Sequence, residues 1–93
     1  MGYIFEWDRK KAESNVRKHG VTFDEASTAF GDPLALLMRD PDHSVDEERY
    51  IVLGMSTRHR LLVVSFAERP PRTRLISARP AGHAERRKYE EES

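Results

Sequence analysis

The 93-residue chain has no cysteine and no long hydrophobic run. Without cysteine there are no disulfides, no thiol chemistry and none of the usual structural zinc sites. No apolar segment approaches the roughly 18 residues of a membrane-spanning helix, and the N-terminus lacks a signal-peptide core. These absences predict a cytoplasmic protein that does not enter a membrane.

Histidine is scarce as well, and its four copies are widely spaced. None stands at i, i+4 or in another of the short paired spacings that metal-binding histidines usually adopt. The densest group of possible ligands surrounds His43, in segment 40–44, but aspartate, proline and serine together are typical of a turn. We therefore expect no metal site and no cofactor.

Hydrophobic residues make up only 38% of the chain. A chain of this length supports one domain with a modest core. We expect a single domain over residues 1–93 that gains part of its stability from a partner.

Charge is balanced in total but not along the sequence. Residues 1–57 carry seven Lys or Arg against eleven Asp or Glu, a net charge of −4, whereas residues 58–93 carry nine against five, a net charge of +4. A localised basic surface attracts an anionic partner such as RNA. The alternative is an arginine-rich face that contacts only solvent.

The N-terminal third combines one strand pattern with two helix patterns. Residues 3–7 have high β propensity, and Asp8 is the N-cap of a helix over 8–19 that ends at Gly20. Residues 22–25 form a capping box, in which a threonine hydroxyl and a glutamate carboxylate would bind free backbone amides at the start of a second helix. The residues that this second helix would bury are Phe23, Ala26, Ala29 and Phe30.

The remainder predicts a sheet followed by a helix. Extended patterns cover 34–38, 49–55, 61–66 and 73–78, and a helix pattern covers 81–92. Because the turns between the strands are short and polar, we expect a mainly antiparallel sheet. The fold class is therefore α+β, with the N-terminal helices packed on the sheet.

The segment from Arg60 to Arg79 gathers charged side chains around a predicted hairpin. Its two strands are separated by Pro70-Pro71, which lack backbone donors and cannot adopt the positive φ of a two-residue type I′ turn. We therefore expect a loop of about four or five residues. Glu68 would then lie opposite Thr73 or Arg74 and face a guanidinium across the strands.

Five blocks along the chain resemble, in order and spacing, the BrnT-type toxins of bacterial type II toxin–antitoxin systems. They read FEWDRKKAESNVRKHGVTFDEA, DPLAL, DHSVDEERYIVLG, AERPPRTRLISAR and ERRKYEE. The resemblance implies a RelE-like fold and a ribonuclease activity that arrests translation. It also implies a BrnA-type antitoxin with a ribbon-helix-helix part, through which the toxin would meet operator DNA indirectly.

The resemblance also assigns individual residues. Glu68 matches the glutamate after the family's central strand, Arg49 the arginine after its acidic pair, and Arg74 and Arg79 the arginines of its RIISAR-like block. The N-terminal block is matched by Trp7, Lys11, Lys18, His19 and Gly20. The chain departs from the family in having Ser65-Phe66 where a histidine is common and Pro80 where a lysine is common, so no histidine is available there as a general acid.

Metal-free cleavage of RNA needs a base for the 2′-hydroxyl proton and cationic donors for the crowded phosphorane. Glu68 is the candidate base. Arg74 and Arg79 are the candidate donors because a guanidinium fork matches phosphate oxygens. A regular strand would place these two arginines on opposite faces, so they converge only if the strand bends, bulges or ends near Ser77. His83 is a weaker candidate for the proton donor.

Six further basic residues are candidates for RNA binding: Arg49, Arg60, Arg69, Arg72, Lys11 and Lys18. Two other interpretations remain open. In the first, the charged residues have structural roles only: Glu68 and Arg74 form an ordinary cross-strand ion pair, and Arg49 pairs with Glu47 or Glu48. In the second, the chain as a whole is not an enzyme: it is a non-catalytic module that binds RNA or DNA, or a subunit that only docks another protein.

Overall fold

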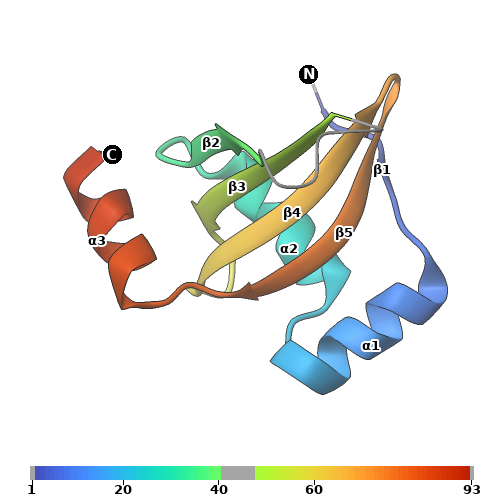
Figure 1. Ribbon diagram of the computed structural model, residues 1–93, viewed down its shortest axis with the longest axis horizontal. Helices are drawn as coiled ribbons and strands as arrows, with labels where there is room; N and C mark the ends of the chain where they lie inside the picture. The colour runs from blue at the N-terminus through green and yellow to red at the C-terminus, as the bar shows by residue number, and fades with distance from the viewer. Residues whose placement is uncertain (1, 41–47, 93) are drawn as a thin grey trace.

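A computed structural model describes residues 2–40 and 48–92. Five strands form one sheet in the order β1-β5-β4-β3-β2 (Figure 1). The strands are β1 (Phe5–Glu6), β2 (Leu36–Arg39), β3 (Arg49–Met55), β4 (Leu61–Arg69) and β5 (Arg72–Pro80). The helices are α1 (Arg9–His19), α2 (Phe23–Thr28), the short 3₁₀ helix η1 (Ala29–Gly31) and α3 (His83–Glu92).

All neighbouring strands are antiparallel except β1 and β5, which run parallel. The predicted α+β class and mainly antiparallel sheet are therefore confirmed. The turn predicted over 40–44 falls mostly on 41–47, outside the described residues, and so does Glu47, one of the two predicted partners of Arg49. No helix in the described part of the chain is long and apolar enough to cross a membrane.

The caps of the N-terminal helices follow the sequence prediction, with one correction. Asp8 accepts a hydrogen bond from the Lys11 amide, and Gly20 ends α1 in the left-handed region at φ 68°. The Thr22 hydroxyl accepts from the Glu25 amide, 3.0 Å away. The second half of the predicted capping box is wrong, because the Glu25 carboxylate binds side chains of the β3–β4 turn instead.

The turn between β4 and β5 is tighter than predicted. Arg69 pairs directly with Arg72, so the loop consists of Pro70-Pro71 alone and not of four or five residues. The peptide bond between the two prolines is cis. The hairpin therefore carries regular pairing to its tip, and β4 extends beyond the predicted 61–66.

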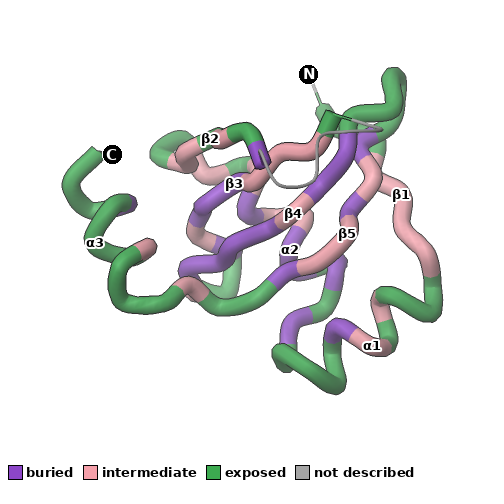
Figure 2. Tube along the Cα trace, in the orientation of Figure 1, coloured by how far each residue is buried: buried purple, intermediate pink, exposed green. Residues whose placement is uncertain are grey.

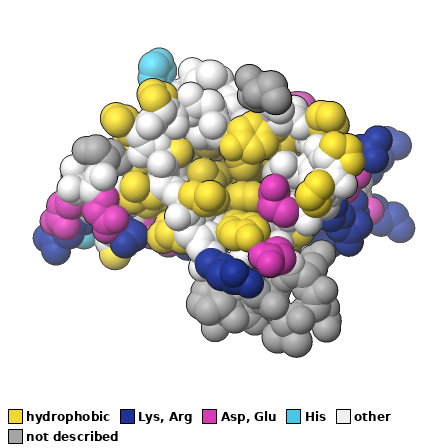
Figure 3. Space-filling view, turned by 90° about the horizontal axis from the view of Figure 1, so that it is seen from above, with side chains coloured by type: hydrophobic (Ala, Val, Ile, Leu, Met, Phe, Trp, Pro, Cys, Tyr) yellow, Lys and Arg dark blue, Asp and Glu magenta, His cyan; other side chains and the backbone are white. Residues whose placement is uncertain are grey.

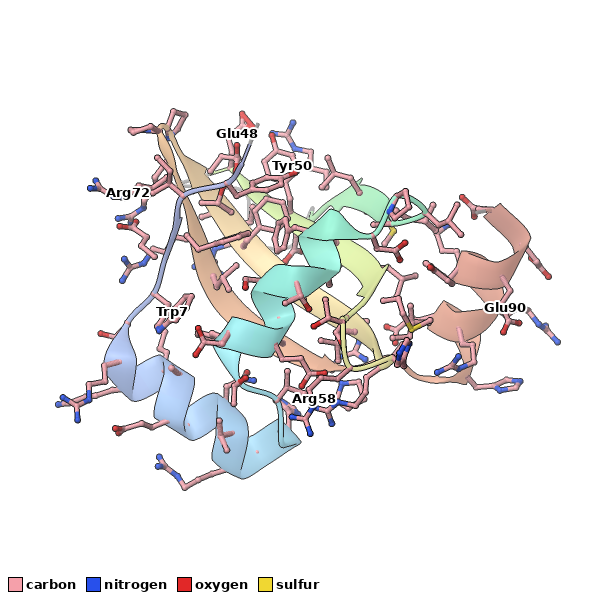
Figure 4. All side chains as sticks on the ribbon, turned by 180° about the vertical axis from the view of Figure 1, so that it is seen from behind. Trp7, Glu48, Tyr50, Arg58, Arg72 and Glu90 are labelled. Atoms are coloured by element: carbon pink, nitrogen blue, oxygen red, sulfur yellow. The ribbon has the colours of Figure 1, made fainter. Side chains whose placement is uncertain are left out.

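One face of the sheet is covered by α1 and α2, as the view from behind shows (Figure 4). Its core contains the buried residues Val21, Phe23, Ala26, Ala29, Val52, Leu62, Val64, Phe66, Leu75 and Ala78. The close approach of η1 to β3 requires glycine at position 54, where a Cβ atom would lie 2.6 Å from the Ala29 carbonyl oxygen.

Within 2–40 and 48–92, the opposite face of the sheet is covered at one end only, by α3 (Figures 1 and 2). There Tyr89 packs against Leu53, Leu61 and Val63. Its hydroxyl donates to Asp32 Oδ2 over 2.6 Å. We call this opposite side, beyond the α3 contact, the open face of the sheet.

Replacing Tyr89 by phenylalanine is expected to lower the free energy of unfolding by about 1 to 2 kcal/mol at neutral pH, because a carboxylate of Asp32 loses a donor. The Asp32 carboxylate raises the pKa of Tyr89 to about 12, from its ordinary 10.0. Stability from this bond is therefore complete below pH 10 and is lost as pH rises towards 12. The free energy of unfolding, measured in urea, should fall between pH 7 and pH 11 in the wild type and fall less in the Tyr89→Phe variant. Equal falls in the two proteins would show that the Tyr89–Asp32 bond is not the cause.

Candidate functional site

A row of side chains crosses the open face near the β4–β5 turn. Strand pairing aligns Arg49 with Ala67, Ala67 with Arg74, and Arg74 with Glu6. Directly paired residues share a face of the sheet, so two arginines and one glutamate lie on this row. Arg49 and Arg74 are half-buried, with their strands held on both sides.

A bulge brings Arg79 to the same face as Arg74. Ser65 pairs with Ser77 but the next residue, Phe66, pairs with Leu75, so β5 contains one extra residue. Arg74 then lies opposite Ala67 and Arg79 opposite Val63, four positions apart on β4 and therefore on one side. The bulge that the sequence required for these two arginines to share a face is thus present.

Arg72, Arg74 and Arg79 each lie against a carboxylate. Arg74 Nη1 lies 3.5 Å from Glu6 Oε2, and Arg72 Nε lies 4.0 Å from the other oxygen of Glu6. Arg79 binds Glu85 of α3 through two bonds of 2.8 and 2.6 Å. The Arg79 guanidinium keeps the pKa of Glu85 below its usual range, against the opposing effect of burial. The guanidinium forks are thus positioned by carboxylates in a geometry that also suits phosphate.

Glu68 lies on the other side of the sheet from these arginines. Its register partner is Thr73, as predicted, and the Thr73 hydroxyl donates to Glu68 Oε1 over 3.2 Å. The predicted contact between Glu68 and Arg74 is wrong, because Arg74 pairs with Ala67 and turns to Glu6. Glu6 was missed because the sequence gave no sign of the parallel pairing between β1 and β5.

The remaining candidates for RNA binding are divided among three regions. By register, Arg69 and Arg72 flank the turn on the same side as Arg74. Lys11 and Lys18 are exposed on α1. Arg60 is separate from both groups, because it is bound to Glu25 on the side of α2.

The Glu25 carboxylate is almost completely buried, with 2% of its side chain exposed. It accepts from Nε and Nη2 of Arg60 and from the Ser56 hydroxyl. Arg60 also donates to the Gly20 carbonyl oxygen, 3.0 Å away. Bonding from Arg60 holds the pKa of Glu25 below its usual range, although burial opposes this. These contacts join α2 to the β3–β4 turn, so Arg60 has a structural role.

A cavity of about 420 Å³ opens on the side of the sheet that η1 covers. It is lined by Tyr3, Phe30, Asp32, Ala35, Leu37, Tyr50, Val52, Phe66 and Glu68. Figure 3, which views this end of the molecule from above, shows hydrophobic side chains gathered there with carboxylates beside them. Within 2–40 and 48–92, no group of three or more histidines and carboxylates is arranged to hold a metal ion.

The fold and the site together define a small α+β protein with an arginine-bearing sheet face. Residues 7–85 match the family described as the ribonuclease toxin BrnT of type II toxin–antitoxin systems, and the chain belongs to this family. Among solved structures it is similar to the Brucella abortus ribonuclease toxin BrnT, with a TM-score of 0.63 and 22% identity over 89% of this chain and 100% of that chain. At this identity the likeness shows a shared fold. No curated protein matches the chain.

Proposed function

We propose that this chain is a toxin endoribonuclease that cleaves RNA without a metal ion and thereby arrests translation in the cytoplasm. The observation that carries the proposal is the placement of Arg49, Arg74 and Arg79 on one face of the sheet. This arrangement supports binding of a single RNA strand along the face, because each guanidinium can donate two parallel bonds to a phosphate. We retain the RelE-like fold as part of this proposal.

In the proposed reaction the 2′-hydroxyl of RNA gives its proton to a base and attacks the adjacent phosphate. The 5′-oxygen leaves and takes a proton from water, which yields a 2′,3′-cyclic phosphate and a 5′-hydroxyl end. Arg74 and Arg79 bind the phosphorane oxygens, whose added negative charge strengthens both contacts in the transition state. The carboxylate on the same face as Arg74 is Glu6, so Glu6 replaces Glu68 as our candidate base. Its position on β1, tied to Arg74, would place a proton acceptor beside the bound phosphate.

The proposed partner is a BrnA-type antitoxin with a ribbon-helix-helix part. An antitoxin carboxylate that paired with Arg74 or Arg79 would compete with phosphate for the same donors. Contact with operator DNA would then take place through the antitoxin.

The test uses purified protein and a defined single-stranded RNA in buffer with EDTA. Arg74→Ala and Arg79→Ala are each expected to lower the cleavage rate about a hundredfold, the usual cost of losing one preorganised donor to a transition-state oxyanion. Glu6→Gln should lower the cleavage rate with little change in RNA affinity, whereas Glu68→Gln should leave the chemical step of cleavage intact. Arg17→Ala, which removes an exposed arginine from α1, is the matched control.

Two results would contradict the proposal. If the wild type retains RNA on a filter but leaves it intact, the chain is a binding module and not a nuclease. If cleavage is unaffected in the folded arginine variants, the open face is not the active site. The fold of each variant is checked by its thermal unfolding transition.

A further inference from the structure

Four of the nine described residues that line the cavity beside η1 are aromatic. Phe30 and Phe66 lie 5.0 Å apart between ring centroids, Tyr50 is stacked on Phe66 at 5.7 Å, and Tyr3 lies 5.1 Å from Phe30. Tyr3 lines the cavity and is 55% exposed as a residue. Exposed aromatic rings around a cavity are the surface on which unpaired nucleobases stack.

Among the described residues two carboxylates line the same cavity, and one of these two is available to a ligand. Both oxygens of Asp32 already accept hydrogen bonds within the protein. Oδ1 accepts from the Leu34 amide, and Oδ2 accepts from the Met55 amide and the Tyr89 hydroxyl. Glu68 accepts one bond, from Thr73 to Oε1, and among the described residues its Oε2 has no hydrogen-bond donor. The cavity thus presents one carboxylate with acceptor capacity next to aromatic rings.

A carboxylate offers two acceptors side by side, and a nucleobase must offer two adjacent donors to match it. Guanine does so on its Watson–Crick edge, with N1–H beside the 2-amino group. Adenine and cytosine each place a ring acceptor next to their amino group, and uracil places its single N–H between two carbonyl oxygens. A lone carboxylate therefore distinguishes guanine from the other three bases.

We propose that this cavity binds a guanine base of the RNA, with Glu68 accepting from its Watson–Crick edge and the rings of Tyr3 and Tyr50 providing stacking surfaces. The inference rests on the proposed ribonuclease function and adds a base preference to it. It also gives a role to Glu68, which the strand register separates from the arginines.

The base site and the arginine row lie at the same end of the sheet. Glu68 directly follows Ala67, which stands between Arg49 and Arg74 in that row. Tyr50 likewise follows Arg49 on β3 and points to the other side, where its hydroxyl donates to Glu48 (Figure 4). An RNA strand that passes over this rim would place one base in the cavity and a neighbouring phosphate on the arginines.

The experiment measures binding of the 5′-monophosphates of guanosine, adenosine, cytidine, uridine and inosine by chemical shift changes in the intact protein. All five carry the same phosphate, so differences report the base. Guanosine monophosphate is expected to bind about tenfold more tightly than the adenosine, cytidine and uridine nucleotides, as for a good bidentate contact to a base edge. The inosine nucleotide, which lacks the 2-amino group, should bind more weakly than the guanosine nucleotide.

Glu68→Gln is the decisive variant, because it keeps the size of the side chain and replaces one acceptor by a donor. It should lower the affinity for guanosine monophosphate about tenfold and leave that for adenosine monophosphate unchanged. Glu90→Gln, at an exposed position of α3 (Figure 4), is the control and should bind as the wild type does. Three results would overturn the proposal: equal affinity for all bases, an unaffected Glu68→Gln variant, or no nucleotide binding at all. The third result would indicate that the cavity binds an apolar side chain of a protein partner.

Cleavage-site mapping separates this inference from the function on which it rests. If the wild type cuts RNA without regard to guanine, the base site fails and the ribonuclease proposal stands. If guanosine monophosphate binds selectively while RNA stays intact, the ribonuclease proposal fails and the base site stands. Agreement of both assays would support a guanine-preferring nuclease.

Discussion

Replacing Asn15 by aspartate is expected to lower the free energy of unfolding at neutral pH by about 4 kcal/mol or more. Asn15 is 4% exposed and makes three bonds in the core. Its Nδ2 donates to the Val21 and Ala78 carbonyl oxygens over 2.9 and 2.8 Å, and its Oδ1 accepts from the Ala78 amide over 3.0 Å. A carboxylate would bring a buried charge against two carbonyl oxygens, which repel it.

The pH dependence identifies this cause. The introduced carboxyl group would have a raised pKa in the folded state, because only its protonated form has a donor for a carbonyl oxygen. The Asn15→Asp variant should therefore be most stable in acid and lose stability as pH rises, which urea unfolding between pH 4 and 8 would measure. Asn15→Ala, which has no such charge, is expected to lose about 3 kcal/mol.

Glu13→Gln is the control, since Glu13 is exposed on the same helix and its contact with Arg9, at 3.5 Å, is a surface ion pair. It should change stability by less than about 0.5 kcal/mol. If Asn15→Asp and Asn15→Ala were as stable as this control, Asn15 would not be the link between α1 and β5. The Asn15→Ala result remains informative even where Asn15→Asp does not fold.

Replacing Arg60 by alanine is expected to lower the free energy of unfolding by about 2 to 3 kcal/mol. The substitution leaves the buried Glu25 carboxylate with the Ser56 hydroxyl and with Arg58, whose Nη1 lies 4.0 Å from Oε1. Breaking a buried ion pair costs about 3 to 5 kcal/mol, and the partial exposure of Arg60 reduces this value. Thermal or urea unfolding at pH 7 measures the effect.

Arg58→Ala is the matched control, because both arginines contact the same carboxylate but Arg58 is 72% exposed. We expect a change below about 0.5 kcal/mol. In the wild type, the lowered pKa of Glu25 contributes stability that is present above its ordinary value of 4.5 and is lost as pH falls through the folded-state pKa. Arg60→Ala should weaken this acid-dependent loss. A variant with wild-type stability and reduced RNA affinity would instead restore Arg60 to the RNA-binding residues.

Local patterns in the sequence predicted the parts of the fold that depend on near neighbours. Asp8, Gly20 and Thr22 act as caps because their bonds are made within four residues along the chain. The same pattern was misleading for Glu25, because its long-range partner Arg60 competes with the local amide. No rule based on neighbouring residues predicts whether Glu25 binds the local amide or Arg60.

The candidate site depended on long-range pairing that the sequence does not display. The parallel contact of β1 with β5 brings Glu6 to Arg74, and the bulge in β5 brings Arg79 to the face of Arg74. The parallel pairing and the bulge both change which residues share a face of the sheet, and neither produces a periodic pattern of hydrophobic residues in the sequence. The arginines could be named from the sequence, but the carboxylate beside them could not.

The missing side chain at Gly54 sets the spacing between η1 and β3 and so sets the dimensions of the cavity. Phe30 and Asp32, which line it, belong to or directly follow η1, while Tyr50 and Val52 come from β3. Even a methyl group at position 54 would meet the Ala29 carbonyl oxygen at 2.6 Å and push the two walls apart. The size of a base that fits between these walls therefore depends on a backbone contact as well as on the side chains that touch the base, which links selectivity at this site to packing of the core.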